Sequence, residues 1–102
     1  MIRHIVMFSA KDKADLETIE GGLNNLTQIP GAYIEITRNQ KADQLENDID
    51  IVVYGEFESI EALNTYKAHP LYEKSTSIVR PLRELRIAAD VEAKTEALKK
   101  SA

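Results

Sequence analysis

The alternation of apolar and polar residues along the chain predicts four strands. They cover Ile2–Phe8, Tyr33–Thr37, Ile49–Phe57 and Leu85–Val91. The polar stretch of residues 39–48 predicts a loop between the second and third strands. In the first and third strands apolar residues occupy both alternating sets of positions, which indicates that both faces of these strands are buried.

Apolar residues at helical spacing predict three helices between the strands. The first helix ends at Pro30-Gly31; the second begins at Ser59, whose side chain can cap it, and ends near His69-Pro70. A short third helix starts at this proline and continues to about Ile78. The apolar stripes are Leu16, Ile19, Leu23, Leu26 and Ile29 in the first helix, and Ile60, Leu63 and Tyr66 in the second. The order βαββαβ predicts an α+β fold of the ferredoxin-like type, a four-stranded antiparallel sheet with helices on one face.

Helices can cover only one face of such a sheet, which leaves apolar side chains on the other face. The uncovered set from the first and third strands comprises Ile5, Met7, Val52 and Tyr54. Leaving these four in water forgoes about 6–10 kcal/mol, which is comparable with the stability of a whole domain. A second copy packed sheet against sheet about a two-fold axis is the simplest cover, so we expect a homodimer.

Composition and charge restrict the classes of function. The 102 residues predict one domain, residues 2–91, followed by a loosely docked C-terminal tail, residues 92–102. A net charge of −4 predicts no binding to nucleic acid or to an anionic membrane, and no apolar run approaches the length of a bilayer span. The absence of cysteine excludes disulfides and thiolate metal sites. We expect a cytoplasmic protein that has no cofactor.

The candidate site lies between the sheet and the helices. We place His4, Val6 and Phe8 on the helix-facing side, together with Val53, because Phe57 on the same side runs directly into the second helix. His4 is the best candidate for acid–base chemistry, since an imidazole titrates near neutral pH, although a lone histidine in such a setting is usually a core residue with a satisfied hydrogen bond. Tyr66 faces inward from the second helix, either as a hydrogen-bond donor to a ligand or as an ordinary core tyrosine.

Three further features leave alternatives open. Gly22 interrupts the apolar stripe of the first helix, either for close helix packing or to leave a cavity for a ligand. Arg80, Arg83 and Arg86 form the one basic concentration, either as a solvated edge or as an anion-binding site. His69 caps the helix before it or meets solvent. Two histidines on separate elements, without acidic residues at ligand spacing, predict no metal site.

Three stretches of the chain resemble the stress-responsive A/B barrel (Dabb) family of dimeric α+β barrels. They are IRHIVMF, IPGAYIEI and YGEFESIEALNTYKAHPLYEKSTSIVRPL, and the resemblance extends from residue 2 to about residue 91. It implies a homodimer whose sheets form a closed barrel. Members that cyclise polyketides have a histidine and a tyrosine that correspond to His4 and Tyr66, with the pocket between sheet and helices. Their general base, a histidine two positions after the proline, corresponds here to Tyr72. A tyrosine with a reference pKa near 10 is a poor base at pH 7.

Two functions follow as hypotheses. The first is a dimeric stress-response domain that binds a small apolar or aromatic molecule, with Val6, Phe8, Gly22, Val53 and Tyr72 around it and no assignable reaction. The alternative is a cofactor-independent cyclase, isomerase or monooxygenase for an aromatic or polyketide-like substrate. In that enzyme His4 would be the acid–base residue and Tyr66 a hydroxyl donor.

Overall fold

The computed structural model describes residues 1–95, which form four strands and three α-helices in the order that the sequence predicts. The strands are β1 (Ile2–Ala10), β2 (Tyr33–Arg38), β3 (Ile51–Phe57) and β4 (Arg83–Glu92). The helices are α1 (Leu16–Asn24), α2 (Ile60–Lys67) and α3 (Pro70–Val79), and short 3-10 turns, Lys13–Asp15 and Asn25–Gln28, flank α1. The predicted C-terminal tail lies largely outside the described residues.

The four strands form one antiparallel sheet in the order β2-β3-β1-β4. His4 in β1 stands opposite Gly55 in β3 and Asp90 in β4. Because neighbouring residues in this register share a face, these positions lie on the same side of the sheet as Val6 and Val53. The predicted ferredoxin-like α+β fold is confirmed.

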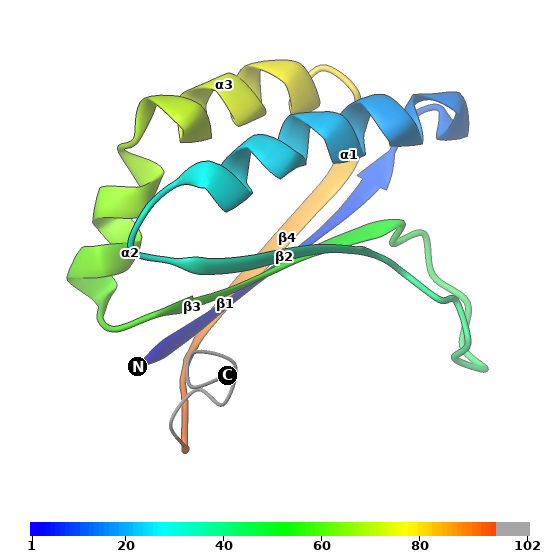
Figure 1. The fold of residues 1–102 in the computed structure, drawn as a ribbon. Helices are drawn as coiled ribbons and strands as arrows, with labels where there is room; N and C mark the ends of the chain where they lie inside the picture. Colours follow the sequence, from blue (N-terminus) through cyan, green and yellow to red (C-terminus); the bar gives the residue numbers. More distant parts are fainter. Residues whose placement is uncertain (96–102) are drawn as a thin grey trace.

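All three helices lie over one face of this sheet, with α1 and α3 side by side (Figure 1). This face carries the buried apolar side chains of β1 and β3, as expected from the sequence. The core consists mainly of Val6, Phe8, Ile19, Leu23, Leu26, Ile51, Val53, Phe57, Leu63, Tyr66 and Val79. The choice of the helix-facing side is therefore correct.

The opposite face of the sheet has no helix over it within residues 1–95 (Figure 1). Ile5, Met7, Val52 and Tyr54 on this face are only partly buried. Strand β4 adds three apolar side chains to the same face, Leu85, Ile87 and Val91, which are 40%, 49% and 46% exposed. The apolar face that the sequence predicts is thus present, and β4 makes it larger.

Some element boundaries differ from the sequence expectation for identifiable reasons. Strand β4 begins at Arg83 rather than Leu85, because two arginines interrupt the apolar alternation at its start. Ile60, expected on the buried stripe of α2, is the first residue of the helix and is 48% exposed. His69 does not cap the preceding helix: its Nδ1 accepts a hydrogen bond from the backbone N–H of Leu71, so it caps α3. None of the helices within residues 1–95 is long and apolar enough to cross a bilayer.

Candidate functional site

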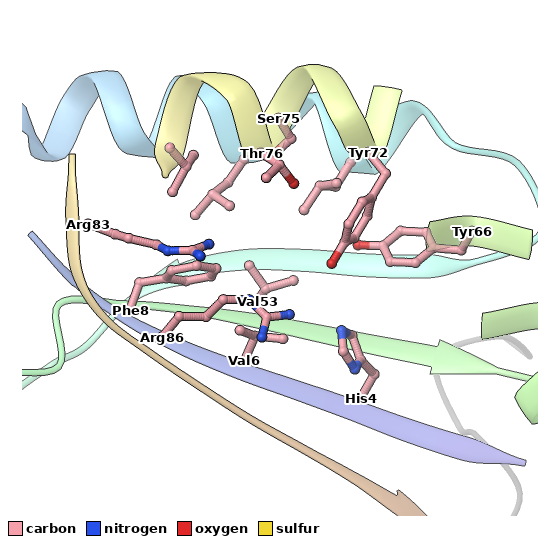
Figure 2. A pocket seen from close by; sticks show the side chains of 13 residues that line it. His4, Val6, Phe8, Val53, Tyr66, Tyr72, Ser75, Thr76, Arg83 and Arg86 are labelled. Carbon is pink, nitrogen blue, oxygen red and sulfur yellow. The ribbon is translucent and has the colours of Figure 1, made fainter. Parts of the chain in front are cut away.

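A cavity lies between the sheet and the helices α1 and α3. It encloses about 360 Å³ that no atom fills, part of which opens to solvent. Its apolar lining consists of Val6, Phe8, Leu23, Leu26, Val53 and Val79. Its polar lining consists of His4, Tyr66, Tyr72, Ser75, Thr76, Arg83 and Arg86 (Figure 2). An apolar hollow with a few convergent polar groups is the usual character of a small-molecule site.

His4 occupies one end of this cavity and is held by an acidic partner on the neighbouring strand. The side chain is 1% exposed, and its Nδ1 hydrogen-bonds to Oδ1 of Asp90. Burial lowers the pKa of His4 below its ordinary value, although Asp90 acts in the opposite direction. The neutral imidazole is therefore favoured, with its Nδ1–H donated to the carboxylate. This tautomer leaves Nε2 as a hydrogen-bond and proton acceptor.

Tyr66 projects from α2 toward the same end of the cavity (Figure 2). It is 2% exposed, and its hydroxyl has no hydrogen-bond partner among the described residues. Burial raises the pKa of Tyr66 well above its usual range, with a smaller contribution from Tyr72. The hydroxyl thus stays protonated at any physiological pH. A buried donor without a partner is costly, which makes it a strong indicator of a ligand contact.

An aromatic cluster holds His4 and Tyr66 in place. The ring of Phe57 packs at 4.9 Å from that of Tyr66 and at 6.1 Å from that of His4, in both cases edge to face. Gly55 makes this arrangement possible, because a Cβ at residue 55 would come within 2.8 Å of Cε1 of Phe57. Tyr72 extends the cluster from α3, with its ring 5.3 Å from that of Tyr66. Packing among four elements, β1, β3, α2 and α3, therefore sets the positions of these polar groups.

Two arginines lie at the other end of the cavity. Arg83 and Arg86 project from β4 beside Phe8 (Figure 2). Neither guanidinium takes part in an ion pair within residues 1–95. Burial lowers the pKa of Arg83, and the charges of Arg86 and Arg80 act in the same direction. No carboxylate is among the residues that line the cavity.

Gly22 is not among the residues that line the cavity. A Cβ at residue 22 would lie 2.8 Å from Cγ2 of Ile78 and 3.1 Å from Cγ2 of Val79. The glycine therefore lets α1 approach α3 closely, and the expectation that it contributes to a ligand site finds no support here. The neighbouring Gly21 has open space around it.

The structure brings together six of the seven site residues that the sequence singled out. His4, Tyr66, Val6, Phe8, Val53 and Tyr72 all line one cavity, and Gly22 does not. Asp90 was missed, although alternation along β4 places it on the helix-facing side of the sheet. Ser75 and Thr76 carried no sequence signal, because nothing in a helix pattern shows which polar residue faces a hollow. Within residues 1–95 no three His, Asp or Glu side chains gather as a metal site would require.

The chain matches a family model described as the stress responsive A/B barrel domain, over residues 2–93. No curated protein matches the chain. Among solved structures, a Dabb family protein with a ferredoxin-like fold from Mesorhizobium loti is 21% identical, with a TM-score of 0.75 over 92% of this chain and 97% of that one.

Two other structures show the same fold. A dimeric ferredoxin-like protein of unknown function from Thermobifida fusca is 21% identical, with a TM-score of 0.75 over 90% of each chain. An antibiotic biosynthesis monooxygenase is 13% identical, with a TM-score of 0.76 over 93% of this chain and 100% of that one. At these identities the structural likeness establishes the fold alone. The family match covers nearly the whole described chain, and this protein therefore belongs to the stress-responsive A/B barrel domain family.

Proposed function

We propose that this protein binds a small, largely apolar molecule in the cavity between the sheet and the helices. The observation that carries the proposal is the hydroxyl of Tyr66, a buried donor without a partner among residues 1–95, beside the free Nε2 of His4. A bound molecule with one oxygen at this end would satisfy the donor. The apolar lining, which includes Phe8 and Val53, would bury the rest of the molecule.

Native mass spectrometry of the freshly purified full chain tests this proposal. We expect a mass above that of the polypeptide that disappears under denaturing conditions. Thr76→Phe, which places a large ring into the cavity from a partly exposed position on α3, should abolish the added mass. Thr65→Phe, at an exposed position on α2, is the matched control and should retain it. Added mass that persists unchanged in Thr76→Phe would place the ligand elsewhere and contradict the proposal.

We also propose that the protein is a homodimer that packs through the uncovered face of the sheet. The partly exposed apolar residues Met7, Val52 and Ile87 on this face support it, as does the description of several structural neighbours as dimeric. Sedimentation equilibrium at micromolar concentration should give twice the mass of the chain. Ile87→Glu should give the monomer mass, because it buries a charge in the interface. Leu45→Glu, in a loop where the leucine is 80% exposed, should remain dimeric. A monomeric wild-type chain would disprove the dimer.

A second candidate function is acid–base catalysis at His4. The hydrogen bond from Nδ1 to Asp90 favours it, because this bond orients the ring and would stabilise the imidazolium that forms when Nε2 takes a proton. In the reaction we propose, Nε2 removes a proton from a carbon next to a carbonyl group. The Tyr66 hydroxyl donates a hydrogen bond to the resulting enolate oxygen, and the imidazolium, after its Nε2 proton exchanges with solvent, delivers a solvent-derived proton to carbon.

Phenylacetone is a suitable probe of this chemistry, because its benzylic protons exchange slowly with neutral water. We expect the wild-type protein to accelerate their exchange in D₂O, as measured by NMR. His4→Asn should lose the acceleration, whereas His69→Asn should retain it, because His69 lies at the start of α3 and does not line the cavity. Equal rates for wild type and His4→Asn would refute catalysis at His4 and leave the binding proposal intact.

A further inference from the structure

The two arginines at one end of the cavity have no acidic partner within residues 1–95. An arginine that serves the fold alone commonly pairs with an acid or extends into solvent. Arg83 is partly buried without such a pair, and Arg86 is exposed at the edge of the sheet, where its side chain still contributes to the cavity lining. Both side chains line the cavity, and in this view they lie on either side of the ring of Phe8 (Figure 2). The protein as a whole carries a net charge of −4, so this concentration of positive charge is local.

The cavity lining therefore carries positive charge from Arg83 and Arg86 and no negative charge to balance it. The lining contains two guanidinium groups and no carboxylate, and the carboxylate of Asp90 is hydrogen-bonded to His4. Burial dominates the pKa shifts of His4 and Tyr66, but the charge of Arg86 adds to the lowering for His4 and opposes the rise for Tyr66, so this charge also acts on the far end of the cavity. Burial is the main cause of the lowered pKa of Arg83, and repulsion from the positive charges of Arg86 and Arg80 lowers it further. An anion between Arg83 and Arg86 would relieve this repulsion.

The shape of the cavity determines which kind of anion fits. Arg86 and Asp90 are four residues apart on β4, which separates their Cα atoms by about 13 Å of extended strand. Since an arginine side chain reaches part of this distance, a ligand that contacts both Arg86 and His4 must be short. The walls between the two ends are apolar, and the cavity is partly open to solvent.

We propose that the cavity binds an aromatic or similarly flat carboxylic acid, with its carboxylate on Arg83 and Arg86 and its other polar group at Tyr66 and His4. This inference rests on the proposed binding function and specifies its ligand class. A guanidinium pairs with a carboxylate through two parallel hydrogen bonds, which a neutral amide cannot reproduce. Arg83 and Arg86 thus determine specificity, and the apolar walls supply contact area that charged and neutral ligands share.

A matched pair of probes separates the two contributions. We would titrate the full chain with 3-phenylpropanoate and with 3-phenylpropanamide, which have nearly the same shape and differ in charge, and follow amide chemical shifts by NMR. The wild-type protein should bind the acid at least about ten-fold more tightly than the amide, because hydrogen bonds to charged groups are the stronger ones. The titrations would be made at 0.15 M salt, where interactions between exposed charges are largely screened beyond roughly 8 Å. Charges far from the cavity then contribute little to the difference between the two probes.

Substitutions assign the preference to particular residues. Arg86→Gln should reduce the preference for the acid to about three-fold or less and leave amide binding nearly unchanged, and Arg86→Lys should restore it only in part. Arg80→Gln is the control: Arg80 is exposed and does not line the cavity, so the acid should retain its advantage. Thr76→Phe should weaken both probes, because it fills the space that they share.

The outcomes distinguish this inference from the function on which it rests. Equal binding of acid and amide to the wild-type protein, unchanged in Arg86→Gln, would overturn the carboxylate site and leave the binding function intact. Binding of neither probe at millimolar concentration would contradict both. An acid preference that Arg80→Gln abolishes and Arg86→Gln preserves would place the anion outside the cavity and equally reject the proposal.

Discussion

Tyr66→Phe should stabilise the protein, although it removes a polar group from the candidate site. The hydroxyl is buried and has no partner among the described residues, and a polar group in that position costs about 1–3 kcal/mol. Phenylalanine keeps the ring and hence the edge-to-face contacts at 4.9 Å to Phe57 and 5.3 Å to Tyr72. After allowance for the small void left by the oxygen, the free energy of unfolding should rise by about 1 kcal/mol. For a domain of this size that corresponds to an increase in Tm of about 4–8 °C.

Urea and thermal unfolding measure this change; all variants are compared at one fixed protein concentration, because the stability of the proposed dimer would depend on concentration. Tyr72→Phe is the matched control: that tyrosine is only partly buried, so its substitution should change stability by no more than about 0.5 kcal/mol. If Tyr66→Phe instead lowers the free energy of unfolding by 1 kcal/mol or more, the hydroxyl has a partner in the ligand-free protein. The assignment of Tyr66 as a free donor would then be incorrect.

Three further substitutions test the packing and the electrostatics. Gly22→Ala should be less stable than Gly21→Ala by about 1–3 kcal/mol in urea unfolding, because only the substitution at residue 22 forces a Cβ against Ile78. Both substitutions gain the same helix propensity, so Gly21→Ala is the matched control. Equal stabilities of the two variants would contradict the close contact between the helices. Because burial lowers the pKa of His4, the unfolded chain binds more protons than the folded chain below about pH 6.5. The free energy of unfolding should therefore decrease as the pH is lowered below this value, by at most about 1.4 kcal/mol per pH unit. A His4→Asn variant with the same pH slope would exclude this residue as the cause. Burial alone would raise the pKa of Asp50, but hydrogen bonds from two lysines and a backbone N–H outweigh it and lower the pKa. Asp50→Asn should therefore destabilise the protein by about 1–3 kcal/mol at pH 7, and the difference should shrink as the pH falls toward 3; a difference that is independent of pH would refute the ion-pair explanation.

The local chemistry of the chain was sufficient to predict its elements. Alternation in β1 and β3 identified both strands and both of their faces, because a side chain in a strand can point only to one side or the other. Ser59 was correctly expected to cap a helix, and its Oγ accepts the backbone N–H of Ala62. The capping role of His69 was assigned to the wrong helix, since a residue between two helices can serve either one and only the backbone geometry decides.

Long-range contacts decided what the local patterns left open. The sequence of α1 made Gly22 compatible with a close contact or with a cavity, and the position of α3 selected the contact. Asp90 is 86 residues from His4 along the chain, so only the pairing of β4 with β1 brings the carboxylate to the imidazole. The same register turns Arg86 toward the cavity. Of the two interpretations that the sequence allowed for the arginines, a solvated edge or an anion-binding site, this position favours the second.

The sequence by itself determined the fold, the helix-facing side of the sheet and six residues around one cavity, because the period of apolar residues specifies which side chains must leave water. The tertiary structure alone decided which polar groups meet: a histidine held by an aspartate, a buried tyrosine donor, and two arginines that form no ion pair within residues 1–95. Such encounters join residues of β1, α2 and β4 that are distant in the chain. No periodicity within one segment can specify them, since each depends on the register between strands and on the packing of helices above the sheet.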